Sequence, residues 1–251
     1  MRARYQLATI VMNTTRTSRF LVTAGGTREL IDRVRDWGNV FTGNTGFGIA
    51  RALSAAGSVD LLTSNRDHQR ELAGAGEDDV LRAIPFTSHG DLRQALATLL
   101  ATQQYHAVFM TAAVSDYRPA GAYEVLSRRP DPANFGQEVW TVKNAQAGKV
   151  KSTFEELAIL GRRTCKLVDL FRTEWAYSGI LVKFKLEVGV DRETLIRIGQ
   201  ASRKASGADY LVANTLDMVS GTDAGAFLLS DSGPEWVPRH DLPERLRRLV
   251  D

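Results

Sequence analysis

The chain has 251 residues, of which 43% are hydrophobic and 24% are charged. These proportions are those of a globular protein and exclude extensive disorder, and the length fits one α/β domain. The net charge of +3 is too small for a surface that coats nucleic acid, so we expect no nucleic-acid partner.

The number and spacing of the cysteine and histidine residues argue against disulfides and against metal sites built from side chains. Cys165 is the single cysteine, which excludes an internal disulfide and fits a reducing cytoplasm. We expect its thiol in the core, where free cysteines usually lie. The four histidines are far apart and no Cys/His spacing suits zinc, so we expect no metal site built from side chains.

The N-terminal apolar run, residues 7–12, is too short for a signal core or a membrane span. We interpret residues 1–18 as a tail or an extra edge strand, and we expect no membrane partner.

From Phe20 onwards, β-rich runs alternate with amphipathic helical stretches, which is typical of a parallel sheet with crossover helices. The first half predicts strands at 20–24, 58–64, 80–86 and 106–114 and helices at 47–57 and 91–104. The second half predicts helices at 166–175, 191–207 and 242–250 and strands at 179–187, 208–214 and 226–231. Residues 19–251 are therefore expected to form one nucleotide-binding domain of Rossmann-like α/β class. It would have a doubly wound, mostly parallel sheet between two layers of helices.

A segment rich in proline and arginine, residues 118–148, shows no clear periodicity. We interpret residues from about 118 to 152 as a flap-like excursion over the carboxyl ends of the strands. Ligands of open α/β sheets bind at those ends.

Two glycine-rich turns belong to the first strand–helix unit. The first could bring backbone amides close to a phosphate, and the second directly precedes a helix whose free amides attract anions. Their residues are Gly25, Gly26 and Thr27 in the first turn, and Gly43, Asn44, Thr45 and Gly46 in the second. Either turn alone is equally well a tight turn or a plain helix cap, but two in one unit favour a nucleotide site.

Several familiar nucleotide motifs are absent around these turns. No Walker lysine follows the second turn, so it is not a P-loop, and the first departs from GxGxxG. The second strand ends in Thr63, Ser64 and Asn65 instead of the acidic residue that holds a dinucleotide ribose. An NADP-binding oxidoreductase or sensor of Rossmann type stays as an alternative, although no YxxxK pair follows the fourth strand.

The fourth strand ends in small residues followed by an acid. Such residues let a flat base or sugar lie against the backbone, and Asp116 could hold a hydroxyl, a base amine or Mg²⁺, or simply cap a turn. Lys149, Lys151 and Lys185 are candidate cations for a charged transition state, although most lysines are merely solvated.

In this order, the motifs resemble the phosphopantothenate–cysteine ligase family. They are AGGTRELIDRVR followed by Asn39, TGxxGF before a helix, MTAAVSDYRP, KVK, VKFKLE and LVAN. The resemblance runs from about Phe20 to the C-terminus. It implies a ligase of coenzyme A biosynthesis that forms an acyl-nucleotidylate from 4′-phosphopantothenate and CTP or ATP, which the amine of cysteine then opens. It further implies Mg²⁺ carried by the nucleotide, a homodimer and a cytoplasmic location.

The resemblance also assigns roles to residues. Asn39 would contact the acyl intermediate and Lys149 would close over the nucleotide, with Lys143 and Lys151 as alternatives for that lysine. Arg35 would serve the dimer or the substrate. The nucleotide neighbours implied, besides the two glycine turns, are Thr111, Ala112, Asp116, Phe184, Lys185, Lys204 and Asn214.

One departure from the family concerns the second glycine turn. Where the family has Ser-Ser-Gly-Lys-Met-Gly, residues 41–46 read FTGNTG, so a basic residue is missing and phosphate binding must depend on backbone amides. A non-catalytic nucleotide-binding paralogue is therefore a further alternative. The sequence does not decide between CTP and ATP.

Overall fold

The computed structural model describes residues 18–76, 79–219, 221 and 224–250. The tail or edge strand expected over residues 1–18 lies outside them, except for Ser18, which begins the first strand. Within these residues, no helix is long and apolar enough to cross a membrane.

The main sheet has eight strands in the order β13-β12-β11-β10-β6-β1-β4-β5. All pairings from β5 to β11 are parallel, whereas β12 and β13 pair antiparallel at one edge. The strands are β1 (Ser18–Ala24), β4 (Gly57–Thr63), β5 (Leu81–Pro85), β6 (Ala107–Met110), β10 (Ile180–Glu187), β11 (Tyr210–Thr215), β12 (Gly225–Ser230) and β13 (Gly233–Pro238). This confirms the mostly parallel, doubly wound sheet.

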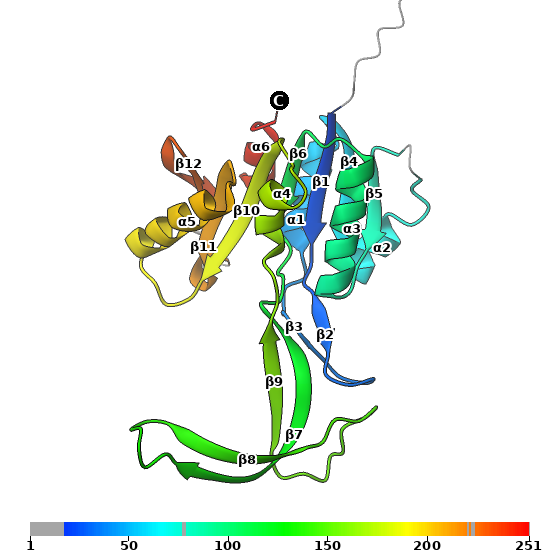
Figure 1. Cartoon of the computed structure of the whole chain (residues 1–251). Coiled ribbons are helices and arrows are strands. Elements are labelled where there is room, and N and C mark those ends of the chain that lie inside the picture. Colours follow the sequence, from blue (N-terminus) through cyan, green and yellow to red (C-terminus); the bar gives the residue numbers. More distant parts are fainter. Residues whose placement is uncertain (1–17, 77–78, 220, 222–223, 251) are drawn as a thin grey trace, which may run out of the picture.

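Helices cover both faces of the sheet (Figure 1). Successive residues of a strand point to opposite faces, and in β1 Phe20 and Val22 pack in one core cluster while Leu21 packs in another. The first cluster lies under α1 (Asn44–Leu53) and α6 (Leu242–Arg247), with α2 (Arg66–Glu71) beside α1. The opposite face carries α3 (His89–Thr102), α4 (Leu167–Thr173) and α5 (Arg192–Ser206). The three-layer α/β/α arrangement is thus confirmed.

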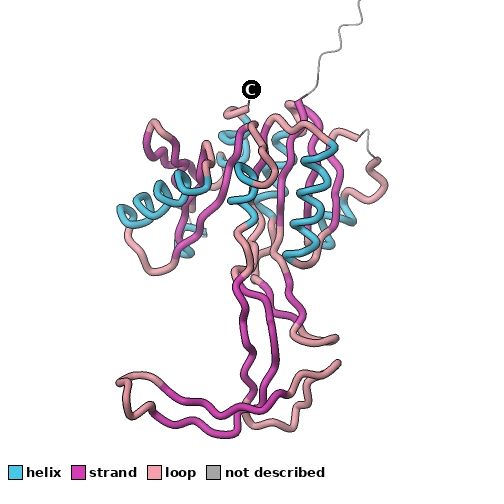
Figure 2. The backbone as a smooth tube through the Cα atoms, viewed as in Figure 1, coloured by secondary structure: helices cyan, strands magenta, loops and turns pink. Residues whose placement is uncertain are grey.

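A second, smaller sheet projects beyond the carboxyl end of the main sheet (Figures 1 and 2). It consists of three antiparallel strands in the order β8-β7-β9, which we call the flap: β7 (Tyr117–Pro130), β8 (Glu138–Asn144) and β9 (Leu157–Arg163). A hairpin of β2 (Arg28–Leu30) and β3 (Asp36–Gly38) lies beside it. The segment without periodicity therefore contains two strands, and the sheet includes a third that ends at Arg163. All seven residues of β8 are exposed, so no buried face imposes an alternating pattern.

The expectation for Cys165 is wrong. This residue lies between β9 and α4 on the surface, and its side chain is exposed. Its Sγ lies 3.9 Å from Nε2 of His89, whose backbone begins α3. The chain crosses the surface here because it is returning from the flap to the main domain.

Candidate functional site

A cavity of about 290 Å³ opens at the carboxyl ends of the central strands. The connection after β5 returns to the other side of β1, so the order of connections reverses between β1 and β6. Ligands of open α/β sheets bind at such a switch point. The lining residues include Gly25, Phe41, Thr42, Gly43, Asn44, Thr45, Gly46, Thr111, Ala112, Phe184, Lys185, Asn214, Val219 and Arg239.

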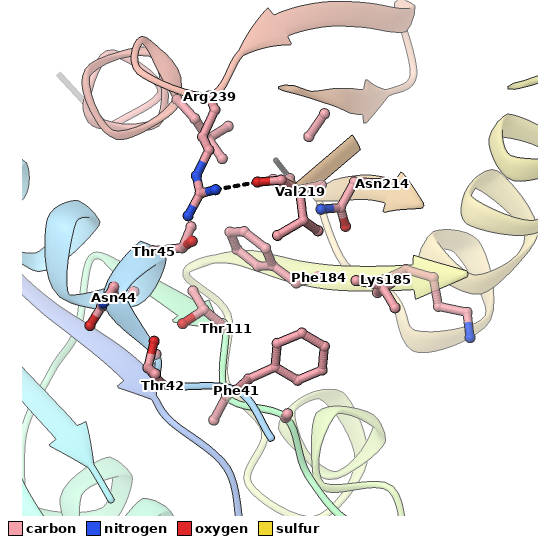
Figure 3. A pocket seen from close by; sticks show the side chains of 18 of the residues that line it. Phe41, Thr42, Asn44, Thr45, Thr111, Phe184, Lys185, Asn214, Val219 and Arg239 are labelled. Carbon is pink, nitrogen blue, oxygen red and sulfur yellow. Dashed lines mark hydrogen bonds between the residues drawn. The ribbon is translucent and has the colours of Figure 1, made fainter. Parts of the chain in front are cut away.

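The N-terminus of α1 forms one side of this cavity. Its N-cap is Gly43, which offers no side chain to the first-turn amides. The Asn44 side chain is occupied outside the cavity, because its Oδ1 lies 3.1 Å from Nε2 of His68. Thr45 faces the cavity in Figure 3. An uncapped helix start that faces a cavity offers N–H donors and a positive dipole end to an anion.

His68 supports this helix start from α2. Its ring stacks on Phe47 with centroids 4.3 Å apart, and its Nδ1 lies 3.1 Å from Oγ1 of Thr63. Burial lowers the pKa of His68, which favours the neutral ring. His68 is therefore a packed structural residue that orients Asn44.

The first glycine turn builds the wall of the cavity. Gly25 and Gly43 both have positive φ angles, of 87° and 81°. A Cβ on Gly43 would lie 2.0 Å from the backbone N of Gly25, so the two turns touch through their backbones. The amides of Gly26 and Thr27 donate within the protein, to Ser64 Oγ at 2.9 Å and to the Ala113 carbonyl at 3.1 Å. These two amides are therefore not offered to a ligand, whereas the amides at the start of α1 follow the uncapped second turn.

Thr27 is buried and serves as a link between strand ends. Its Oγ1 lies 2.9 Å from Ser115 Oγ and accepts the Ser115 amide at 2.8 Å. Neither Gly26 nor Thr27 lines the cavity.

Asn39 lies at the mouth of the crevice between β1 and β6. Its Nδ2 donates to the carbonyl of Ala113 at 3.0 Å, and Ala113 lines the cavity. The side chain is exposed and lies against Gly26, where an added Cβ would be 3.3 Å from Asn39 Cβ. Asn39 itself is not a lining residue, but its bond to Ala113 places it beside the rim of the cavity.

Aromatic side chains form the remaining wall. Phe184 on β10 and Phe41 before the second glycine turn both extend into the cavity in Figure 3, with Thr111 between them and α1. Asn214 reaches the cavity from the end of β11. Lys185 follows Phe184, but its Nζ lies 2.9 Å from Glu187 Oε1 and points away from the cavity. This wall suits a flat base more than a phosphate.

Arg35 lies where the connection from β8 to β9, which contains Lys149, packs against the β2–β3 hairpin. Asp32 accepts the amide of Val150 at 3.0 Å and Nε of Arg35 at 3.0 Å, and Arg35 also donates to the Val150 carbonyl at 2.6 Å. These hydrogen bonds, led by the Val150 amide, hold the pKa of Asp32 well below its usual range. Lys149 is exposed and does not line the cavity, and the same holds for Lys143 and Lys151.

Two further candidates lie away from the cavity. Asp116 is exposed at the base of the flap, where its carbonyl accepts the amide of Thr164 at 2.9 Å. Lys204 lies in the last turn of α5, which runs back from the carboxyl end of β10 to the start of β11. That turn is at the opposite end of the sheet, so the structure does not bring Lys204 to the cavity.

Sequence reasoning missed Phe41 and Arg239 as lining residues. The sequence contained a weak indication that Phe41 lines the cavity, because this residue directly precedes the second glycine turn. Arg239 carried none, since it follows an edge strand that the sequence did not predict. Among the residues that the structure describes, no acidic side chain lines the cavity, and no group of three His, Cys, Asp or Glu side chains is placed to hold a metal.

Comparison with known proteins identifies relatives of this chain. Residues 15–130 match the family described as DNA/pantothenate metabolism flavoprotein C-terminal domain. The coenzyme A biosynthesis bifunctional protein CoaBC of Mycolicibacterium smegmatis is 37% identical over 238 residues, which cover 92% of this chain and 51% of that protein. CoaBC of Thermococcus kodakarensis is 28% identical over 234 residues, with coverages of 93% and 50%. The chain thus spans about half the length of these relatives.

Solved structures agree with this relationship. The DNA/pantothenate metabolism flavoprotein from Streptococcus pneumoniae has a TM-score of 0.75 and 28% identity, covering 93% of this chain and 98% of that one. A mutant Cab2 in complex with phosphopantothenate-cysteine has a TM-score of 0.64, covering 93% of this chain and 86% of that one; at 17% identity it shows the shared fold. The resemblance drawn from the sequence motifs is confirmed.

Proposed function

Because this chain is related to the phosphopantothenate–cysteine ligase domains, we propose that it joins 4′-phosphopantothenate to cysteine in coenzyme A biosynthesis. The observation that carries the proposal is the cavity at the β1/β6 switch point. It combines an uncapped helix start, an aromatic wall and Asn39 at its rim. These are the parts that phosphates, a base and a reacting acyl group require.

The reaction would proceed in two steps. A carboxylate oxygen of 4′-phosphopantothenate attacks the α-phosphorus of CTP or ATP, and pyrophosphate leaves with the electrons of the broken P–O bond. The amine of cysteine then attacks the acyl carbon, the nucleoside monophosphate leaves, and the amine proton passes to solvent. Mg²⁺ on the phosphates would neutralise their charge.

Residues of the cavity would act by positioning and by hydrogen bonding. The first-turn amides of α1 would donate to phosphate oxygens, and Phe184 and Phe41 would hold the base. The amide group of Asn39 would donate to the acyl oxygen as the second step begins. A mixed anhydride hydrolyses readily, so the reaction also requires that water be kept out.

We propose a homodimer in which the flap contributes the contact surface. The flap exposes the large apolar side chains of Val139, Trp140, Val142, Leu157 and Leu160, and a cluster of this kind is typical of a protein–protein contact. Lys149 lies in the connection from β8 to β9, beside the β2–β3 hairpin and outside the cavity of its own chain. Its proposed closure over a nucleotide therefore requires a rearrangement of the flap or a second copy. A cytoplasmic location stays a prediction.

The test is pyrophosphate release with Mg²⁺, 4′-phosphopantothenate and either CTP or ATP, with and without cysteine. We expect cysteine-dependent turnover with one of the two nucleotides. Asn39→Asp should accumulate the acyl-nucleotidylate, detected by mass spectrometry, whereas Asn134→Asp in the flap should behave as the parent protein. Nucleotide binding without pyrophosphate release would favour the non-catalytic paralogue.

A further inference from the structure

We propose that Arg239 is the cation that binds the nucleotide phosphates in this chain. The second glycine turn, which begins α1, contains no basic residue. The inference rests on the proposed nucleotide-dependent function and deepens it, because it states which end of the cavity takes the phosphates.

The cavity lining offers few cations. Among the lining residues that the structure describes, Lys185 and Arg239 are the two with a charged nitrogen. Lys185 is neutralised by Glu187, at 2.9 Å, and is directed outward (Figure 3). Arg239 is therefore the lining cation that faces the interior of the cavity.

Two contacts fix the position of Arg239 directly after β13. Its backbone amide donates to the Ala224 carbonyl at 2.9 Å, and its Nη1 donates to the Val219 carbonyl. Figure 3 shows the guanidinium lying at the rim of the cavity, directed toward Thr45 in the first turn of α1. One bond to Val219 leaves further N–H groups of the guanidinium on the side that faces Thr45.

This arrangement gives the cavity two chemically different ends. The guanidinium and the start of α1 are both electropositive and face one another, whereas Phe41 lies on the opposite side of the cavity, with Phe184 between the two (Figure 3). A phosphate oxygen between Arg239 and Thr45 would accept charge-assisted hydrogen bonds from the guanidinium and N–H groups from the helix. The base would then stack at the aromatic end.

Arg239 also holds the Val219 carbonyl, so a variant could weaken binding merely by loosening that loop. Ligands that differ only in their phosphates separate the two effects. The experiment therefore measures dissociation constants for CTP, CMP and cytidine, and for ATP, AMP and adenosine, by calorimetry in constant Mg²⁺. The proteins are the parent chain, Arg239→Ala, Arg239→Lys and the control Arg248→Ala. Arg248 is an exposed arginine that pairs with Glu244 at 3.2 Å, outside the cavity.

We expect Arg239→Ala to weaken binding of the triphosphate roughly ten- to a hundredfold, while nucleoside binding changes less than about threefold. Arg239→Lys should recover only part of the loss, because an ammonium lacks the planar fork. Arg248→Ala should match the parent protein. An equal loss for triphosphate and nucleoside, or no loss, would overturn the inference and leave the proposed function standing. A parent protein that binds no nucleotide at all would overturn both.

Discussion

The contact between the two glycine turns predicts that two Gly→Ala variants at α1 differ sharply in their free energy of unfolding. In Gly43→Ala the new Cβ would lie 2.0 Å from Gly25 N and 2.7 Å from Gly25 Cα. Both are backbone atoms that cannot rotate away. In Gly48→Ala, on the same helix, the new Cβ would meet only Pro243 Cγ, at an ordinary 3.6 Å. The first variant must move a turn, and the second needs no movement.

The size of this difference follows from the backbone conformation at the two glycines. The φ of +81° at Gly43 costs an alanine about 1–2 kcal/mol, and the displaced turn adds to this. Gly48 lies inside the helix, where alanine is favoured over glycine by about 0.5–1 kcal/mol. The free energies of unfolding of the two variants should therefore differ by at least about 2 kcal/mol, a large part of a domain's stability.

Urea denaturation followed by circular dichroism measures this difference, and nucleotide titration measures its effect on the site. We expect Gly43→Ala to unfold at lower urea and to bind nucleotide more weakly, and Gly48→Ala to unfold at higher urea with unchanged affinity. If Gly43→Ala were as stable as the parent protein, the backbone contact between the two turns would be disproved.

Three further predictions concern other parts of the chain. Asp32→Asn removes the charge that holds the Val150 amide, so residues 148–151 should exchange their amide hydrogens faster than in the parent protein. Because folding lowers the pKa of Asp32, its stabilisation is complete above about pH 4 and is lost as the pH falls toward the folded value. In acid titration the parent protein should therefore lose more stability than Asp32→Asn, in which other carboxylates with lowered pKa values still titrate. Tyr105→Phe removes a buried hydrogen bond to Asp60 and should lower the free energy of unfolding by about 1–2 kcal/mol in urea denaturation; no change would mean that this bond adds nothing. Cys165 is exposed, so Ellman's reagent should label the folded protein without denaturant; a thiol that reacts only after unfolding would contradict the structure.

The main domain could be predicted from the sequence because its elements each have a buried face. The sequence of β1 is a continuous apolar run because helices cover both faces of this strand. The sequence of α1 shows helical periodicity because only one side of this helix packs against the core. The strands of the flap escaped prediction for the converse reason. A strand such as β8, exposed throughout, leaves no pattern in its sequence, and in β13 the prolines at 234 and 238 obscure a short edge strand.

The candidate site was predictable only where a residue follows a predicted strand or helix start. Asn214 reaches the cavity because parallel strands end together, and Asn44 and Thr45 because they begin a helix. Phe184 lies inside β10, and only the family resemblance pointed to it. The position of Arg239 depends on the antiparallel pairing of β12 and β13 at the edge of the main sheet and on its contacts with Ala224 and Val219. No local sequence pattern encodes these interactions. The distance of Lys149 from the cavity depends on the position of the flap, and the role of this lysine stays a prediction.

The packing of α6 against α1 has a consequence for the order of events during synthesis. Leu242 and Leu246 of α6 lie in the same core cluster as Phe47 and Leu53 of α1, and Leu242 also lines the cavity. The helix that presents its amides to a ligand therefore lacks one of its packing partners until α6 leaves the ribosome and docks. A nascent chain should accordingly acquire nucleotide affinity late and abruptly, and ligand capture by ribosome-bound chains of increasing length would report when the domain closes.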